Sequence, residues 1–207
     1  MMDRSRLEAF SDGVLAVAIT LLALNLTVAG PGHGTLLHQL GDRWPAFLAY
    51  LISFVTIGII WVNHHALVGN IAVVDRRLMF INLILLIFVV LIPFATGTMA
   101  QYLTHGGMDS SVAMAIYAAV FEGMSLGFAA LILWTLAPGN SIHPVPVVRH
   151  RSVALRFTLG VFIYLPAIGL AFISPPAALV VIGLVAVYYI FERTPSPGPA
   201  SEGLEDR

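Results

Sequence analysis

The stretch Arg6-Leu-Glu-Ala-Phe-Ser-Asp-Gly-Val-Leu-Ala-Val-Ala-Ile-Thr-Leu-Leu-Ala-Leu24 decides the fold of this 207-residue chain. It begins with a charged turn that holds Glu8 and Asp12, and it then stays apolar for long enough to cross a bilayer, which takes about 20 residues. A simple membrane anchor has no need of Asp12, Gly13 or Thr20. We therefore interpret this stretch as a helix that lines an ion pathway.

The composition of the whole chain is that of an integral membrane protein. Hydrophobic residues make up 58% of it and charged residues only 10%, whereas soluble domains carry about 25% charged residues. The mean hydropathy is +0.91. A net charge of −1 gives no reason to expect a nucleic-acid partner, and the absence of cysteine excludes disulfides and cysteine-based metal sites.

Six apolar stretches qualify as membrane spans or come close, and none of them alternates as a barrel strand would. We therefore expect an all-α integral membrane protein in which residues 1–193 form one transmembrane domain and residues 194–207 a disordered cytoplasmic tail. Acidic residues at the start of the first span argue against its removal as a signal peptide. The expected spans are Leu7–Val28, Trp44–Val68, Leu78–Gln101, Val112–Leu136, Val148–Ile173 and Pro176–Phe191.

The positions of the arginines predict how the chain is oriented in the membrane, because basic residues favour the cytoplasmic side. All ten basic residues are arginines. With six spans, nine of them fall on one side of the membrane and only Arg43 falls on the other. Both termini are therefore expected to be cytoplasmic.

One stripe of the first helix combines a hydroxyl group with apolar side chains. On a helix of 3.6 residues per turn, the residues that share this stripe are Phe10, Gly13, Val17, Thr20, Leu24 and Val28. Apolar rings can gate a pore by dewetting, and hydroxyl oxygens can replace part of an ion's hydration shell. The same stripe would also suit ordinary packing between helices, with the threonine bonded to its own backbone.

A second group of polar residues is expected at the cytoplasmic end of this helix, because the second span ends there with Trp61-Val-Asn-His-His65. A hydrogen-bonded network would satisfy these groups together. Its expected members are Arg6, Ser11, Asp12, Asn63 and one of His64 and His65, with Asn82 of the third span in the same layer. The two histidines also fit a pH sensor, or a metal or haem site, although their side chains point about 100° apart on a helix.

Glu122 is the one acidic residue that lies deep within a span. Such a carboxyl group is either hydrogen-bonded between helices or part of an ion or proton pathway. A proton-coupled secondary transporter that uses Glu122 with His64 and His65 is therefore the alternative to a channel. The sequence carries none of the nucleophile, zinc or phosphate-binding motifs of enzymes, so we expect neither enzymatic activity nor a bound metal or cofactor.

The segment Arg6-Leu-Glu-Ala-Phe10-Ser11-Asp12 resembles the Arg-x-x-x-Phe-Ser-Asp signature of the transmembrane protein 175 potassium channels. The continuation Gly-Val-x-Ala-x-Ala-Ile-Thr-Leu, the Trp61–His65 segment and the six-span layout extend the resemblance to residues 4–193. It implies a homotetramer in a bacterial inner membrane that conducts K⁺ passively, without a cofactor, through a central pore.

The same resemblance implies roles for particular residues of the first helix. In the family, hydrophobic side chains and a threonine or serine of this helix form the constriction and the filter. Counted from the signature, these positions fall on Val17, Thr20 and Leu24. The signature residues themselves would brace the pore helix against its neighbours at the cytoplasmic end.

Overall fold

All elements in the part of the chain that the structure describes, residues 3–143 and 147–191 without the side chains of 147–158, are helices. The fold comes from a computed structural model, and it confirms the all-helical expectation for this part of the chain. The expected tail, 194–207, lies outside the described residues. The elements are α1 (Arg4–Leu22), the 3₁₀ turn η1 (Ala23–Asn25), α2 (Leu36–Asp42), α3 (Trp44–Gly69), α4 (Arg76–Tyr102), α5 (Gly107–Leu136), α6 (Val147–Ala171) and α7 (Pro175–Phe191).

Four helical segments are long and apolar enough to cross a membrane, namely Arg4–Asn25, α3, α4 and α5. Within the described residues, the last two apolar helices are shorter than these four. α7 has 17 residues, and the apolar part of α6 within the described residues is Leu159–Ala171. α6 as a whole has 25 residues, but arginines at 149, 151 and 156 occupy its first half.

The first helix differs most from expectation. It was expected to reach Val28, but the α-helix ends at Leu22 and a single 3₁₀ turn follows. The Asn25 side chain in that turn donates a hydrogen bond of 3.0 Å to the backbone carbonyl of Pro93 in α4. The turn is thus held by another helix, and the extension of the apolar stripe to Val28 was wrong because Val28 lies beyond the helical residues.

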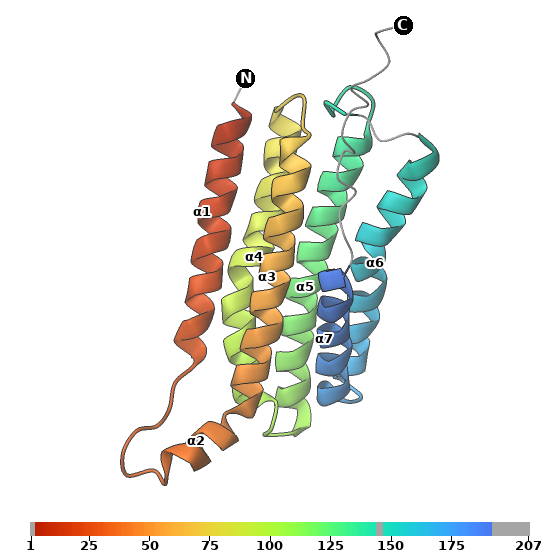
Figure 1. Ribbon diagram of the computed structural model, residues 1–207. Helices are drawn as coiled ribbons and strands as arrows, with labels where there is room; N and C mark the ends of the chain where they lie inside the picture. Colours follow the sequence, from red (N-terminus) through yellow and green to blue (C-terminus); the bar gives the residue numbers. More distant parts are fainter. Residues whose placement is uncertain (1–2, 144–146, 192–207) are drawn as a thin grey trace, which may run out of the picture.

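α1 stands at one edge of the bundle, and α6 and α7 stand at the other (Figure 1). α5 lies between them, packs against α4, α6 and α7, and buries most of its side chains. Gly127 permits the close approach of α4, since a Cβ atom there would lie 2.9 Å from the Leu85 Cα. α1 packs through one face only, against α3 and α4.

A buried chain of hydroxyl groups joins α3, α4 and α5. Ser53 Oγ lies 2.8 Å from Thr96 Oγ1 and 2.9 Å from the Tyr117 hydroxyl. Because Thr96 donates its only proton to the carbonyl of Ile92, Ser53 must donate to Thr96, and Tyr117 must donate to Ser53. Each of these three hydroxyl protons therefore has an acceptor. The hydrogen bonds join α3, α4 and α5 into one unit, which we call the slab.

Two loops lie together at the end of the bundle where α1 begins. Ala72 N donates to Asn140 O at 2.9 Å, and Ile142 N donates to Asn70 O at 2.8 Å. At the same end, Arg4 Nη1 donates to the carbonyl of Gly69 at 2.8 Å. Asp3 caps α1, and the hydrogen bonds that Ser5 donates to its carboxylate lower the pKa of Asp3.

Candidate functional site

The two faces of α1 have different surroundings. The inner face is buried against α3 and α4, and its residues are Leu7, Ser11, Leu15, Ala18 and Leu22. The outer face holds the stripe expected from the sequence: Gly13 and Thr20 are exposed, Val17 is 55% exposed and Leu24 is 71% exposed. The whole stripe, from Phe10 to Leu24, therefore has no covering helix among the described residues of a single chain.

Thr20 holds the only hydroxyl group on this exposed stripe. Its Oγ1 donates a hydrogen bond of 2.8 Å to the carbonyl of Val17, one turn earlier. The proton is thereby directed at the helix backbone, and the hydroxyl oxygen keeps its lone pairs for another partner. An exposed oxygen acceptor between two apolar side chains suits a partly dehydrated cation better than an anion.

A buried polar chain fixes the inner face of α1 near its first turns. His64 Nε2 lies 2.8 Å from Asn82 Oδ1, Asn82 Nδ2 donates to Ser11 Oγ at 2.9 Å, and Ser11 Oγ donates to Leu7 O at 2.9 Å. Since the amide oxygen of Asn82 can only accept, His64 carries its proton on Nε2. His64 Nδ1 has no hydrogen-bond partner within the described residues.

A second, more exposed pair of contacts lies beside this chain. His65 Nδ1 is 2.7 Å from Glu8 Oε1, and Trp61 Nε1 donates to Asp12 Oδ1 at 3.0 Å. One ligand atom each from Glu8, Asp12 and His65 lie within 4.8 Å of one another, so these residues are the set that could hold a metal ion. The adjacent histidines face different surroundings, because His64 is fully buried and the His65 side chain is 62% exposed.

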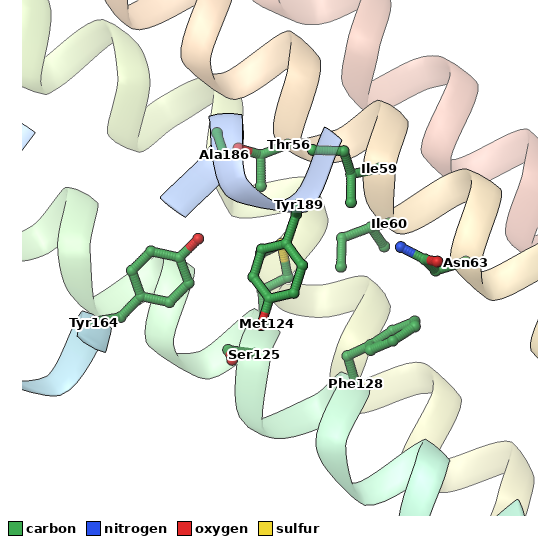
Figure 2. Close-up of a pocket in the computed structure, with 10 residues that line it drawn as sticks. All are labelled: Thr56, Ile59, Ile60, Asn63, Met124, Ser125, Phe128, Tyr164, Ala186 and Tyr189. Atoms are coloured by element: carbon green, nitrogen blue, oxygen red, sulfur yellow. The ribbon is translucent and has the colours of Figure 1, made fainter. Parts of the chain in front are cut away.

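The structure does not bring all of the expected network residues together. Arg6 and Phe10 are exposed, and Phe10 continues the outer stripe. Asn63 is buried on another face of α3, where it lines a cavity of about 40 Å³ bounded by α3, α5, α6 and α7. Figure 2 shows this cavity, with Ser125, Tyr164 and Tyr189 among the polar side chains around it.

Glu122 lies in α5, away from the polar chain at the start of α1. It is 7% exposed, and its Oε2 has no hydrogen-bond partner within the described residues. No histidine of the pair at 64 and 65 bonds to it, since His64 contacts Asn82 and His65 contacts Glu8. The arrangement that a transporter using all three residues would need is therefore absent from the described side-chain contacts.

Sequence reasoning missed three contacts that position α1. Glu8 and Trp61 stood in the quoted segments but were not assigned as partners of His65 and Asp12, and Asn25 was not singled out at all. A signal for Asn25 did exist, because an amide near the end of an apolar span requires a hydrogen-bond partner. The identity of that partner depends on how α1 and α4 pack.

Comparisons with known proteins place these features in a family. A family model described as the endosomal/lysosomal potassium channel TMEM175 matches residues 6–93. A potassium channel of Streptomyces collinus is 44% identical over 199 residues, covering 95% of this chain and 96% of that protein. The endosomal/lysosomal proton channel TMEM175 of Gallus gallus is 31% identical over 173 residues, covering 75% of this chain and 33% of that protein.

A solved structure shows the same likeness in three dimensions. The crystal structure of a lysosomal potassium-selective channel TMEM175 homolog from Chamaesiphon minutus superposes with a TM-score of 0.79 at 33% sequence identity. The match covers 90% of this chain and 96% of that chain.

Proposed function

This chain belongs to the TMEM175 family of ion channels, and from that premise we propose that it conducts potassium passively through a central pore lined by α1 of four subunits. The family is one of channels and not of enzymes. The observation that carries the proposal is the exposed stripe of α1, in which a hydroxyl oxygen lies between apolar side chains. In an arrangement of four α1 helices around an axis, this exposed stripe would face the same stripe of the other subunits.

In this pore, Thr20 supplies a ring of oxygen ligands, and Val17 and Leu24 supply apolar constrictions on either side. The Thr20 oxygen suits this role because its proton is committed to Val17 O. Apolar rings raise the free-energy barrier for a hydrated ion, and oxygen ligands lower this barrier by replacing part of the hydration shell. Selectivity then depends on how far the ion must dehydrate at the Thr20 layer.

The base of α1 serves as a brace that holds the pore helix to the rest of the subunit. Ser11 joins it to Asn82 and His64, while Glu8 and Asp12 join it to His65 and Trp61. Arg6 and Phe10 are exposed and would act between subunits. Asn63 faces the interior of the subunit and supports α3 from the other side.

The proposal extends to topology and location. α6 and α7 complete six spans, residues 1–193 form one channel unit, and both ends of the chain lie on the cytoplasmic side of a bacterial inner membrane. Support comes from the arginine distribution, and from the hydrogen bond of Arg4 to Gly69 O at the end of α3, seven residues before Arg76 in the chain. No cofactor is needed for passive conduction.

Potassium is proposed over protons as the main permeant ion, although the animal relative is named a proton channel. The exposed stripe carries no titratable side chain. The titratable residues of α1 are Arg4, Arg6, Glu8 and Asp12, and all of them lie before Gly13, toward the start of the helix from Val17 and Thr20. A proton-coupled transporter is not favoured, because the relatives are named channels and Glu122 does not meet the histidines.

Purified protein in liposomes tests the pore. Replacing Thr20 by Ala should lower the K⁺-to-Na⁺ permeability ratio, measured as a shift in reversal potential, whereas Thr20→Ser should largely retain it. Leu24→Ala should raise the flux, and Leu133→Ala, at an exposed leucine of α5, is the matched control. If Thr20→Ala and Leu24→Ala both behave like the wild-type protein, α1 does not line the pore.

A further inference from the structure

Asn25 connects the end of α1 to the backbone of α4. Its Nδ2 donates to Pro93 O at 3.0 Å. Gly97 lies one turn further along α4, at the position whose backbone N–H bonds Pro93 O in an α-helix. The side-chain amide therefore contacts one turn of α4 at these two residues.

The space for this amide exists only because residue 97 is glycine. A Cβ atom at position 97 would lie 2.5 Å from Asn25 Oδ1, 3.0 Å from its Cγ and 3.4 Å from its Nδ2. All three of the nearest atoms belong to the Asn25 side chain, so this side chain occupies the notch. We call Asn25, Pro93 and Gly97 the outer latch.

The outer latch is the second of two amide attachments between α1 and α4. The first is the bond from Asn82 to Ser11 near the start of α1. Between them, the inner face of α1 consists of Leu15, Ala18 and Leu22, which form no hydrogen bonds through their side chains. Asn25 is therefore the hydrogen-bonded attachment that ties the end of α1 to α4.

Leu24 immediately precedes Asn25 in the same 3₁₀ turn, and its side chain is 71% exposed. Fixing the Asn25 amide in the notch fixes the rotation of this turn, and with it the direction of Leu24. An opening lies at the latch, so the amide would have access to water once it is freed; it is lined by Leu24, Asn25, Thr27, Arg43, Ala46, Gly97, Ala100 and Gln101. Without the latch, water would compete for the freed amide, and the turn would lose its fixed orientation.

We propose that Asn25, held in the Gly97 notch, is a positioning residue for the outer constriction and thereby a determinant of ion preference. This inference rests on the proposed pore, in which Leu24 forms that constriction. Asn25 contacts α4 and not the ion, and it acts by holding Leu24 toward the pore axis. Loss of the latch then widens the Leu24 layer and weakens discrimination between K⁺ and Na⁺.

A double-mutant cycle tests the latch, with the variants Asn25→Ala, Gly97→Ala and the two combined. In the wild-type background the methyl group added by Gly97→Ala collides with Asn25, and in the Asn25→Ala background the same methyl group enters vacant space. The effect of Gly97→Ala should therefore depend on residue 25. Gly58→Ala is the matched control, because a Cβ at this helical glycine of α3 meets nothing within 4 Å.

Two quantities are measured for each variant: the melting temperature in detergent and the K⁺-to-Na⁺ permeability ratio in liposomes. We expect Gly97→Ala alone to lower the permeability ratio about threefold or more, and to change it less than about twofold when Asn25 has already been replaced by alanine. The melting temperature should show coupling of the same sign. Gly58→Ala should leave both quantities unchanged.

The outcomes separate the latch from the pore. Additive effects in both measurements would overturn the latch, and coupling in the melting temperature alone would reduce Asn25 to a structural residue and overturn its positioning role. Leu24→Ala reports on the pore independently, since it leaves the notch intact. A normal flux together with a normal permeability ratio in Leu24→Ala would overturn the assignment of Leu24 to the pore, while the melting-temperature cycle would still decide whether the latch exists.

Discussion

α1 and α5 are both apolar helices that can cross a membrane, yet they bury very different amounts of their surface. In α5 the buried residues surround the helix, whereas in α1 they form a single line from Leu7 to Leu22. A helix that is hydrophobic on all sides belongs in a core. The comparison teaches that the slab of α3, α4 and α5 holds the fold, and that one face of α1 remains uncovered in a single chain, as the proposed pore requires.

The largest expected difference in stability is between alanine variants of two phenylalanines, one in α5 and one in α1. Phe121 in α5 is fully buried, and its ring centroid lies 4.5 Å from that of Tyr117, so Phe121→Ala should cost about 3–5 kcal/mol of unfolding free energy. Phe10 in α1 is 54% exposed, so Phe10→Ala should cost less than about 0.5 kcal/mol. Unfolding of dissociated protomers in detergent measures both costs. Equal costs would mean that the outer face of α1 is packed within one subunit.

The two adjacent histidines sharpen the comparison at the base of α1. His64→Ala removes a fully buried ring and leaves Asn82 Oδ1 without its donor, which should cost about 1–3 kcal/mol. His65→Ala removes a mostly exposed contact with Glu8 and should cost less than about 1 kcal/mol. Chemical unfolding of the two variants measures these two losses of unfolding free energy. The reverse order would show that the exposed pair, and not the buried chain, holds α1.

The hydroxyl chain tests whether α3, α4 and α5 act as one slab. Ser53→Ala leaves the Tyr117 hydroxyl without its acceptor and Thr96 without its donor, and hydrogen bonds between membrane helices are worth about 0.6–1.7 kcal/mol. We expect a loss in that range, with conduction unchanged. A large change in ion preference at unchanged stability would argue that this chain lies close to the ion path.

The smallest expected effect on stability is at Val17. Its side chain is 55% exposed, so Val17→Ala should change the unfolding free energy by less than about 0.5 kcal/mol. Flux should nevertheless rise, because a smaller side chain lowers the apolar barrier next to Thr20. Stability and flux measured on the same preparation check this. A stability loss without a flux change would assign Val17 to packing.

The helices of this chain could be predicted from the sequence, because twenty apolar residues between polar turns leave the backbone few alternatives to a helix in a membrane. α3 differs from expectation by one residue, whereas α5 begins five residues earlier, at Gly107. The expected layer of polar groups contains Ser11, His64 and Asn82 in direct contact. Periodicity alone also marked the stripe with Val17 and Thr20.

The remaining contacts of α1 depend on how the helices are rotated against one another, which no pattern within one helix determines. Asn63 and His64 are neighbours in the chain. Asn63 lines a cavity, whereas His64 bonds to Asn82, which in turn bonds to Ser11 of α1. The end of α1 was placed too late because Asn25 bonds to Pro93, a residue 68 positions away. Such contacts require the packed structure.

Asn70 has a mechanical consequence for the whole subunit. Its side chain donates to His143 O at 3.1 Å and accepts from His143 N at 2.9 Å, so one residue copies both bonds of a strand pair and clamps the α3–α4 turn to the loop after α5. The slab is thereby stiffened at the end where α1 begins. At the opposite end, α1 leads into Gly30, Gly32 and Gly34, which all adopt positive φ angles. This glycine loop is tied back by Gln39, whose side chain bonds the backbone of Gly30 and Gly34, so the segment that leaves α1 is anchored at two successive points, Asn25 and Gln39.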